Sequence, residues 1–508
     1  MEINCAKHNL ITEETIFKAS GEVEVKTAIP IPVGRQMSRV LKCSLKAAVT
    51  SAPISDKTVT VEGPVTLSVI CIDNENRLFS LGKTLSFSRS FEADIPLVGG
   101  EATACIEEEK LTANSEEGGK LVLCGSFSLS VSLKKPIQQE VICDIDGKDL
   151  EQRIRASGIT SPIGRGEKNL IAEEEISVGS SQPSVDCIIR SHADSVIEET
   201  GIVGNKVMIK GIFKIYVLYL PEEGTRPQSF EESYPFSQLI EVDGITENCR
   251  VSAESRVVFC ELTPRPDIDG DLRTFTANLK LIVSVKAYCD EELPLVTDAF
   301  STVGGLELTA KEINFSSIKE NINERFIARK ELEFTDGAIG SVIDMWCENR
   351  GSLCRFEEGQ FKIAGTILIN LLAYDCEGVP NCYERPVDFE YIRPISPSDL
   401  SLTADYRCTV INSSYTIIGA NTLSVAVEPM VEATILENRK LTLITDVLPT
   451  DERTPSDSSG IILYFADAGE DIWDIAKRYN SSISEIKELN GITEDLLTEP
   501  KKFLIPTK

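Results

Sequence analysis

The chain has 508 residues, of which 42% are hydrophobic, and this length predicts three or four domains. Its 80 acidic and 51 basic residues give a formal net charge of −29. Nucleic acids and anionic membrane surfaces are polyanions, so a protein that binds them needs a dense positive patch. The sequence has no run of lysine or arginine that could supply one, and we expect neither ligand.

Catalytic and metal-binding residues are scarce. Histidine is the usual proton carrier near neutral pH and a common metal ligand, yet the chain has only His8 and His192. His192 lies in the segment Arg190-Ser191-His192-Ala193-Asp194-Ser195. A catalytic triad is assembled from residues far apart in sequence, so this short cluster is interpreted as incidental. We predict no enzyme activity, no metal and no cofactor.

The 15 cysteines are scattered, and no C-x-x-C pair occurs. Several lie within or beside apolar strand patterns, where a thiol behaves as a small buried hydrophobe: Cys71, Cys124, Cys260 and Cys289. This usage is typical of a reducing compartment. The N-terminal residues lack the apolar core of a signal peptide, and the longest apolar run, near Gly365–Ala373, is too short to span a bilayer. We therefore expect a cytosolic protein without a transmembrane segment.

Three segments repeat one pattern, in which a central glycine is flanked by alternating apolar residues. They are Val59-x-Val61-x-Gly63-x-Val65-x-Leu67-x-Val69, Val207-x-Ile209-x-Gly211-x-Phe213-x-Ile215-x-Val217 and Phe361-x-Ile363-x-Gly365-x-Ile367-x-Ile369-x-Leu371. The glycines are 148 and 154 residues apart. Alternation with a period of two predicts a strand with one buried face, and the glycine in mid-strand predicts a bulge or a sharp bend.

A second alternating run follows in each repeat, at Leu129–Leu133, Leu281–Val285 and Leu423–Val427. Helical periodicity is scarce between residues 40 and 450. The predicted fold is therefore mainly β, with three tandem antiparallel domains of the β-sandwich or barrel-like type, each with a core of its own. We place these domains at residues 1–155, 156–315 and 316–448.

The character of the chain changes after Leu448. Residues 449–460 are rich in Pro, Ser and Asp and predict an extended linker. Residues 461–508 predict a small module of strand, helix, helix and strand. The first helix would bury Ile472, Ile475, Ala476 and Tyr479 behind an N-cap at Asp471. The second would begin with a capping box at Ser482 and Glu485, bury Ile483, Ile486 and Leu489, and stop at Asn490-Gly491.

This module resembles a LysM domain. The likeness rests on three segments: Gly469-Glu470-Asp471-Ile472-Trp473-Asp474-Ile475-Ala476-Lys477-Arg478-Tyr479, Glu488-Leu489-Asn490-Gly491 and Phe503-Leu504-Ile505-Pro506. In the family, the loops before the first helix and after the second form a shallow groove for polymers of N-acetylglucosamine. Here Glu470-Asp471 replaces the usual Asp-Thr/Ser, and Pro500-Lys501 replaces the usual Pro-Gly, which disfavours glycan binding.

Trp473 lies outside the predicted apolar face of the first helix, so we expect it to be partly exposed. Two interpretations of it stay open, since it could anchor a protein partner or merely flank the small core. The predicted partner-binding residues are Trp473, Ile462, Glu470, Asp471, Lys477 and Lys501.

The repeated strands resemble SPOCS domains, and several such domains followed by one LysM resemble the spore-coat morphogenetic proteins of clostridia. The resemblance implies a scaffold in the mother-cell cytoplasm, at the forespore surface. It also implies that the LysM binds the coat-basement ATPase, stage IV sporulation protein A, and that other coat proteins are further partners. The alternative is a protein that binds peptidoglycan or other N-acetylglucosamine polymers. A hydrolase that uses only carboxylates is a remote third hypothesis.

Overall fold

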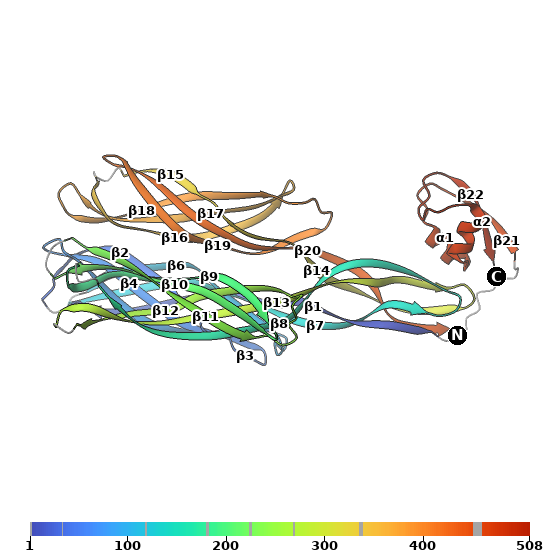
Figure 1. Ribbon diagram of the computed structural model, residues 1–508, viewed down its shortest axis with the longest axis horizontal. Helices are drawn as coiled ribbons and strands as arrows, with labels where there is room; N and C mark the ends of the chain where they lie inside the picture. The colour runs from blue at the N-terminus through green and yellow to red at the C-terminus, as the bar shows by residue number, and fades with distance from the viewer. Residues whose placement is uncertain are drawn as a thin grey trace.

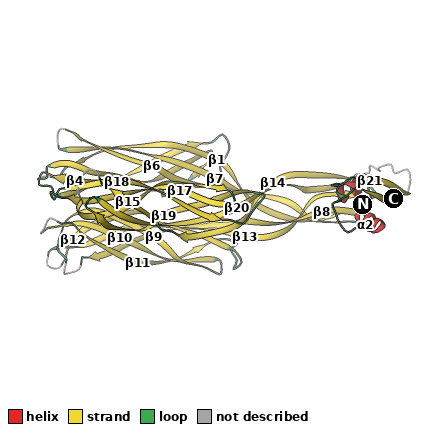
Figure 2. Cartoon of the chain, turned by 90° about the horizontal axis from the view of Figure 1, so that it is seen from above, coloured by secondary structure: helices red, strands yellow, loops and turns green. Residues whose placement is uncertain are grey.

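The computed structural model describes residues 3–32, 34–116, 119–178, 182–222, 226–267, 270–334, 339–450 and 460–507. Within these ranges the chain is almost entirely β-strand, and both of its helices lie near the C-terminus. Figures 1 and 2 show three elongated β units side by side, with a narrower stalk at one end and the small helical module beside the tip of the stalk.

Each unit is a sandwich of two antiparallel sheets. In the first unit the strands are β1 (Asn4–Pro30), β7 (Lys120–Asp146) and β6 (Glu101–Glu116) against β2 (Met37–Ala47), β3 (Ile54–Ser55), β4 (Thr58–Asp73) and β5 (Leu78–Glu92). In the second they are β8 (Leu150–Ser177), β13 (Leu272–Ser301) and β12 (Arg250–Pro266) against β9 (Val185–Val203), β10 (Lys206–Pro221) and β11 (Gln228–Glu241).

The third unit repeats this plan with one strand divided in two. Its sheets are β14 (Gly305–Arg325), β15 (Ala328–Glu333), β20 (Thr422–Thr450) and β19 (Ser401–Gly419) against β16 (Ile339–Glu357), β17 (Gln360–Asp375) and β18 (Pro380–Pro394). The mainly β fold and the sandwich form of its domains are therefore confirmed.

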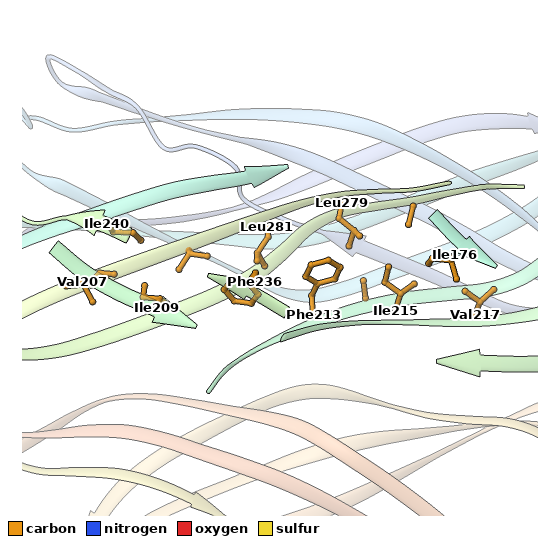
Figure 3. Close-up of a cluster of buried hydrophobic side chains, with 14 of the residues drawn as sticks. Ile176, Val207, Ile209, Phe213, Ile215, Val217, Phe236, Ile240, Leu279 and Leu281 are labelled. Carbon is orange, nitrogen blue, oxygen red and sulfur yellow. The ribbon is translucent and has the colours of Figure 1, made fainter. Parts of the chain in front are cut away.

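The repeated pattern forms the central strand of one sheet in each unit: β4, β10 and β17. The apolar residues of all three patterns are buried, and the second alternating runs are buried against them from β7, β13 and β20. Figure 3 shows this packing in the second unit, where Val207, Ile209, Phe213, Ile215 and Val217 share one core with Leu279 and Leu281. The period-two prediction is confirmed in all three repeats.

The central glycines let the two neighbouring strands of the sheet approach closely. Gly211 pairs with Phe236 on β11, and the carbonyl of Val196 on β9 lies where a side chain would begin. The register between β10 and β9 shifts at this glycine, and that between β16 and β17 shifts opposite Gly365. The expected irregularity is confirmed at Gly211 and Gly365, and it lies on the strand that faces the glycine.

The stalk is built from three two-stranded ribbons, one from each unit. Residues 4–12 pair with 137–146, residues 150–160 with 290–301, and residues 305–318 with 436–450. Their apolar side chains form two clusters to which every unit contributes: Leu10, Val141, Ile159, Leu295, Ile313, Phe315 and Leu443, then Ile142, Ile145, Val296, Ala299, Ile444 and Val447. The units thus have their own cores and share further ones.

The predicted domain boundaries lie near the turns between these ribbons. The chain passes from the first unit to the second at residues 147–149 and from the second to the third at 302–304. The boundaries predicted at 155/156 and 315/316 lie inside β8 and β14. Of the predicted linker, 449–460, residues 451–459 lie outside the described residues.

The three units also meet along a seam, which we define by the equivalent edge positions Lys42, Arg190 and Asp344. Each lies opposite the residue seven places after a central glycine, because Lys42 pairs with Ile70, Arg190 with Leu218 and Asp344 with Leu372. Apolar residues of all three units pack into one cluster around them: Ile70, Ile72, Leu78, Ile189, Leu218, Leu220, Trp346 and Leu372.

The charges at the seam are paired between units. Arg190 of the second unit lies 3.2 Å from Asp344 of the third, which also accepts a hydrogen bond from Tyr216 at 3.0 Å. Lys42 of the first unit is 4% exposed, and its Nζ donates to Asn370 and Glu384 of the third unit at 2.7 and 2.5 Å. Each buried charge therefore has a partner on another unit, as burial requires.

No helix among the described residues has the length and apolar character needed to cross a membrane.

We predict that Gly211→Ala destabilises the second unit by about 1–3 kcal/mol, because the added methyl would overlap the carbonyl of Val196 and the ring of Phe236. Urea unfolding measures the loss. The control is Gly158→Ala, a strand glycine with no atom within 4 Å of the added methyl. Equal stability of the two variants would contradict this account of the glycine.

We predict that Asp344→Ala lowers the free energy of unfolding by about 2–4 kcal/mol, because it leaves the Arg190 guanidinium, which is only 18% exposed, without its counter-charge. Asp388→Ala, an exposed carboxylate on β18, serves as the control and should cost well under 1 kcal/mol. A cost at Asp344 no larger than that at Asp388 would show that the ion pair does not hold the units together.

Candidate partner-binding site

The C-terminal module has the predicted order of elements: β21 (Gly460–Ala466), α1 (Ile472–Tyr479), α2 (Ile483–Asn490) and β22 (Lys501–Thr507). The two strands pair antiparallel. Alternation along β21 and β22 turns Ala466, Phe503 and Ile505 towards the helices, where they are buried with Ile472 and Ile486. The module thus has its own small core.

The first helix forms as its sequence predicts. Asp471 is the N-cap, and its carboxylate accepts a hydrogen bond from the backbone N–H of Trp473 at 2.9 Å. Ile472, Ile475 and Ala476 are buried and Tyr479 is partly buried against the same core, which confirms the predicted apolar face. The helix ends at Asn480, which adopts the left-handed conformation.

The second helix is held to β22 by one asparagine. The amide of Asn490 donates to the carbonyls of Ile486 and Leu504 at 2.8 and 2.7 Å, and its oxygen accepts from the N–H of Leu504 at 2.7 Å. Gly491 ends the helix with a φ of 62°, as predicted. The expectation that Leu489 is buried is wrong, because this residue is 43% exposed, whereas Ile486 is buried and Ile483 partly buried against the core of the module.

Trp473 is buried, at 6% exposure, so the expectation that it is partly exposed is wrong. The cause is the stalk, which the sequence alone did not place beside the module. The Trp473 ring meets Phe300 of β13 edge to face, with centroids 5.2 Å apart, and the Arg153 guanidinium of β8 lies over it. Its indole N–H donates to Asp298 at 2.8 Å. We call this contact between the module and the stalk the dock.

Charged pairs surround the tryptophan in the dock. The Lys477 ammonium lies between the two carboxylate oxygens of Asp298, at 2.6 and 2.7 Å. Arg153 pairs with Asp471 at 2.6 Å. Lys477 and Arg153 are 43% and 49% exposed, so water screens these pairs and each contributes little to stability.

The stalk also caps the second helix of the module. Ser482 occupies the predicted N-cap position, but its hydroxyl makes no capping bond. It donates instead to the carboxylate of Glu151 on β8 at 2.8 Å, and the same oxygen accepts from the backbone N–H of Ile483 at 3.2 Å. The Ser482 half of the predicted capping box is therefore wrong, since Glu151, more than 300 positions away, holds this hydroxyl and the first N–H of the helix.

The six predicted partner-binding residues are thus divided. Trp473, Asp471 and Lys477 come together in the dock. Glu470 turns away from it and accepts hydrogen bonds from the Tyr464 hydroxyl at 2.7 Å and from the backbone of Asp467. That bond to Glu470 raises the pKa of Tyr464 above its usual range.

The other two residues, Ile462 and Lys501, lie on the strands. Ile462 of β21 pairs with Ile505, and Lys501 of β22 pairs with Ala466. The structure does not bring either of them to the dock. Whether any of the six binds a partner stays a prediction.

Sequence analysis missed an apolar surface on the outer side of the module's sheet. Ile461, Leu463 and Phe465 of β21 are 62%, 54% and 64% exposed, and Leu504 of β22 lies opposite Leu463. We call these four residues the apolar sheet face. The signal for it lies in β21 itself, where large apolar residues occupy the outward positions as well as the inward ones. A strand that is apolar on both sides usually has both sides covered.

The remaining sequence candidates gain no support as sites. His192 Nε2 lies 2.5 Å from Asp194, but Ser191 and Ser195 point to the opposite side of β9 because side chains alternate along a strand. Burial raises the pKa of the Cys71 and Cys382 thiols to about 12, so both stay protonated. Within the described ranges, no group of three or more metal-ligating side chains comes together.

Two protein-family models match the chain. The model described as "SipL, SPOCS domain" matches residues 184–264, which span β9 to β12 of the second unit. The LysM domain model matches residues 468–506. Comparison with curated proteins and with solved structures found no match.

The chain contains a SipL-type SPOCS domain and a LysM domain. Both are non-catalytic binding domains, and their combination fits a sporulation protein associated with the coat. The resemblance to SPOCS and LysM domains is confirmed by these two matches.

We predict that Asn490→Ala destabilises the LysM by about 2–3 kcal/mol, because it removes the hydrogen bonds that join α2 to β22. Hydrogen exchange of the full chain should speed up across 460–507 and stay unchanged in the three β units. Glu488→Ala, an exposed position two residues earlier on the same helix, is the control. Unchanged exchange in the Asn490 variant would contradict this role.

Proposed function

We propose that this protein is a non-enzymatic scaffold of the spore coat, which holds other coat proteins in place around the forespore from the mother-cell cytoplasm. The observation that carries the proposal is the pairing of a SPOCS domain with a LysM domain on one chain. Three sandwiches packed side by side offer several outward strand edges, a large surface for binding other proteins.

We propose further that the LysM captures the coat-basement ATPase, stage IV sporulation protein A. The support is the family resemblance together with the apolar sheet face, which exposes four large apolar side chains on a module of fewer than 50 residues. Exposed apolar patches of this kind mark protein interfaces. Lys502 lies over the Phe465 ring at 5.3 Å, so this surface carries a positive charge beside its apolar side chains that could pair with an acidic group of a partner.

The second candidate function is binding of peptidoglycan or other N-acetylglucosamine polymers, which the LysM match favours. In this chain, however, Asp471 of the groove loop is paired with Arg153 of the stalk. A glycan that enters there would have to displace a charged pair. The protein-binding function is therefore the better supported of the two.

We expect that pull-down of stage IV sporulation protein A by the full chain is lost when residues 451–508 are removed. Leu463→Glu should weaken capture at least tenfold, because it places a charge on the apolar sheet face. The control is Leu353→Glu, which makes the same change at an exposed leucine of the third unit.

Titration of the full chain with N-acetylglucosamine oligomers separates the second candidate. Capture that survives removal of the LysM would overturn its assigned role. Saturable binding of the oligomers at micromolar concentration, without capture of the ATPase, would favour the glycan function.

A further inference from the structure

We propose that the dock is an autoinhibitory latch: the stalk covers the α1 face of the LysM, so that a partner able to reach the apolar sheet face cannot also contact α1 until the module leaves the stalk. This inference rests on the proposed function, because it concerns access to the same module. It goes beyond that function, since it assigns a regulatory role to stalk residues that do not themselves bind the partner.

The stalk covers the side chains of α1 that are chemically suited to bind another protein. Trp473 combines a large apolar surface with one hydrogen-bond donor, and such residues often dominate interfaces. In the dock the Trp473 ring packs against Phe300, and its N–H donates to Asp298. Lys477, the exposed cation one turn later, is held by the same Asp298. A partner that needs this face must displace the stalk.

The dock is specific, because the stalk complements the module at several points. Asp298 pairs with the Lys477 ammonium and accepts a hydrogen bond from the Trp473 indole N–H. Arg153 pairs with Asp471, and Glu151 accepts a hydrogen bond from Ser482 at the start of α2. The two stalk carboxylates thus face hydrogen-bond donors of the module, and the stalk guanidinium faces the module's Asp471 carboxylate. This arrangement of alternating charge is what a built interface requires.

The dock is also weak enough to open. Its ion pairs are half exposed, and exposed pairs contribute little. Its apolar part is one phenylalanine against one tryptophan, whereas the module keeps its own core of Ile472, Ile475, Ala476 and Ile486. The module can therefore leave the stalk without unfolding. A partner then binds only the open fraction of molecules, so its apparent affinity falls by that fraction.

The test uses the full chain with Asp298→Lys, which turns the central attraction with Lys477 into repulsion. Glu312→Lys is the matched control, because it makes the same charge change on another ribbon of the stalk, where Glu312 faces Lys440. Acrylamide quenching of tryptophan fluorescence reports the dock, since the second tryptophan, Trp346, is 8% exposed in the seam and away from the stalk tip. Binding of stage IV sporulation protein A is measured on the same samples.

We expect Asp298→Lys to increase quenching and to strengthen partner binding about tenfold or more, while Glu312→Lys changes neither. Adding Lys477→Asp to Asp298→Lys should restore the shielding of Trp473, because the pair is re-formed with its signs exchanged. Shielding that persists in Asp298→Lys would overturn the dock.

Exposure of Trp473 without stronger binding would overturn the latch and leave the proposed function intact. If neither the wild-type chain nor the variant binds the ATPase, the proposed function fails. Quenching still decides in that case whether the stalk holds the module, because it requires no partner.

Discussion

The arrangement of the three β units depends on the charged seam between them. Equivalent strand positions carry Lys42, Arg190 and Asp344, so a repeated position has been given different charges in different units. Desolvation offsets much of the attraction within a buried ion pair, so such a pair adds little net stability. Moving the third unit to the place of either other unit would bring the two cations together or leave a charge unpaired, at a large cost. The seam therefore fixes the place of the third unit relative to the other two, and the apolar cluster around it supplies the stability.

The stalk is a consequence of this side-by-side arrangement of the units. When the sandwiches are fixed side by side, the long paired strands that extend beyond them must run together, and their apolar sides can be buried only against one another. The ribbon of the second unit then presents Glu151, Arg153, Asp298 and Phe300 to the C-terminal module. A distant interaction thus decides what surrounds Trp473.

Local sequence predicted the parts of this molecule and missed their assembly. The alternation around Gly63, Gly211 and Gly365 was enough to predict buried strands, and Asp471 and Gly491 predicted helix ends, because these features depend on neighbours in sequence. The burial of Trp473 and the role of Ser482 could not be predicted, since both depend on stalk residues far away in the chain. The seam could not be predicted either, because Lys42, Arg190 and Asp344 are different residues, and only the strand register shows that their positions are equivalent.

The meeting of all three ribbons in one stalk gives the molecule two unlike ends. Every passage from one unit to the next, and the point where the chain leaves for the LysM, lies at the narrow end (Figure 1). The broad end consists of hairpin tips, among them the turns at Glu377-Gly378 and Asn421-Thr422. In a layer of such molecules oriented alike, the broad ends would form one surface and the C-terminal modules the other. A sheet of coat built from them would have distinguishable inner and outer sides.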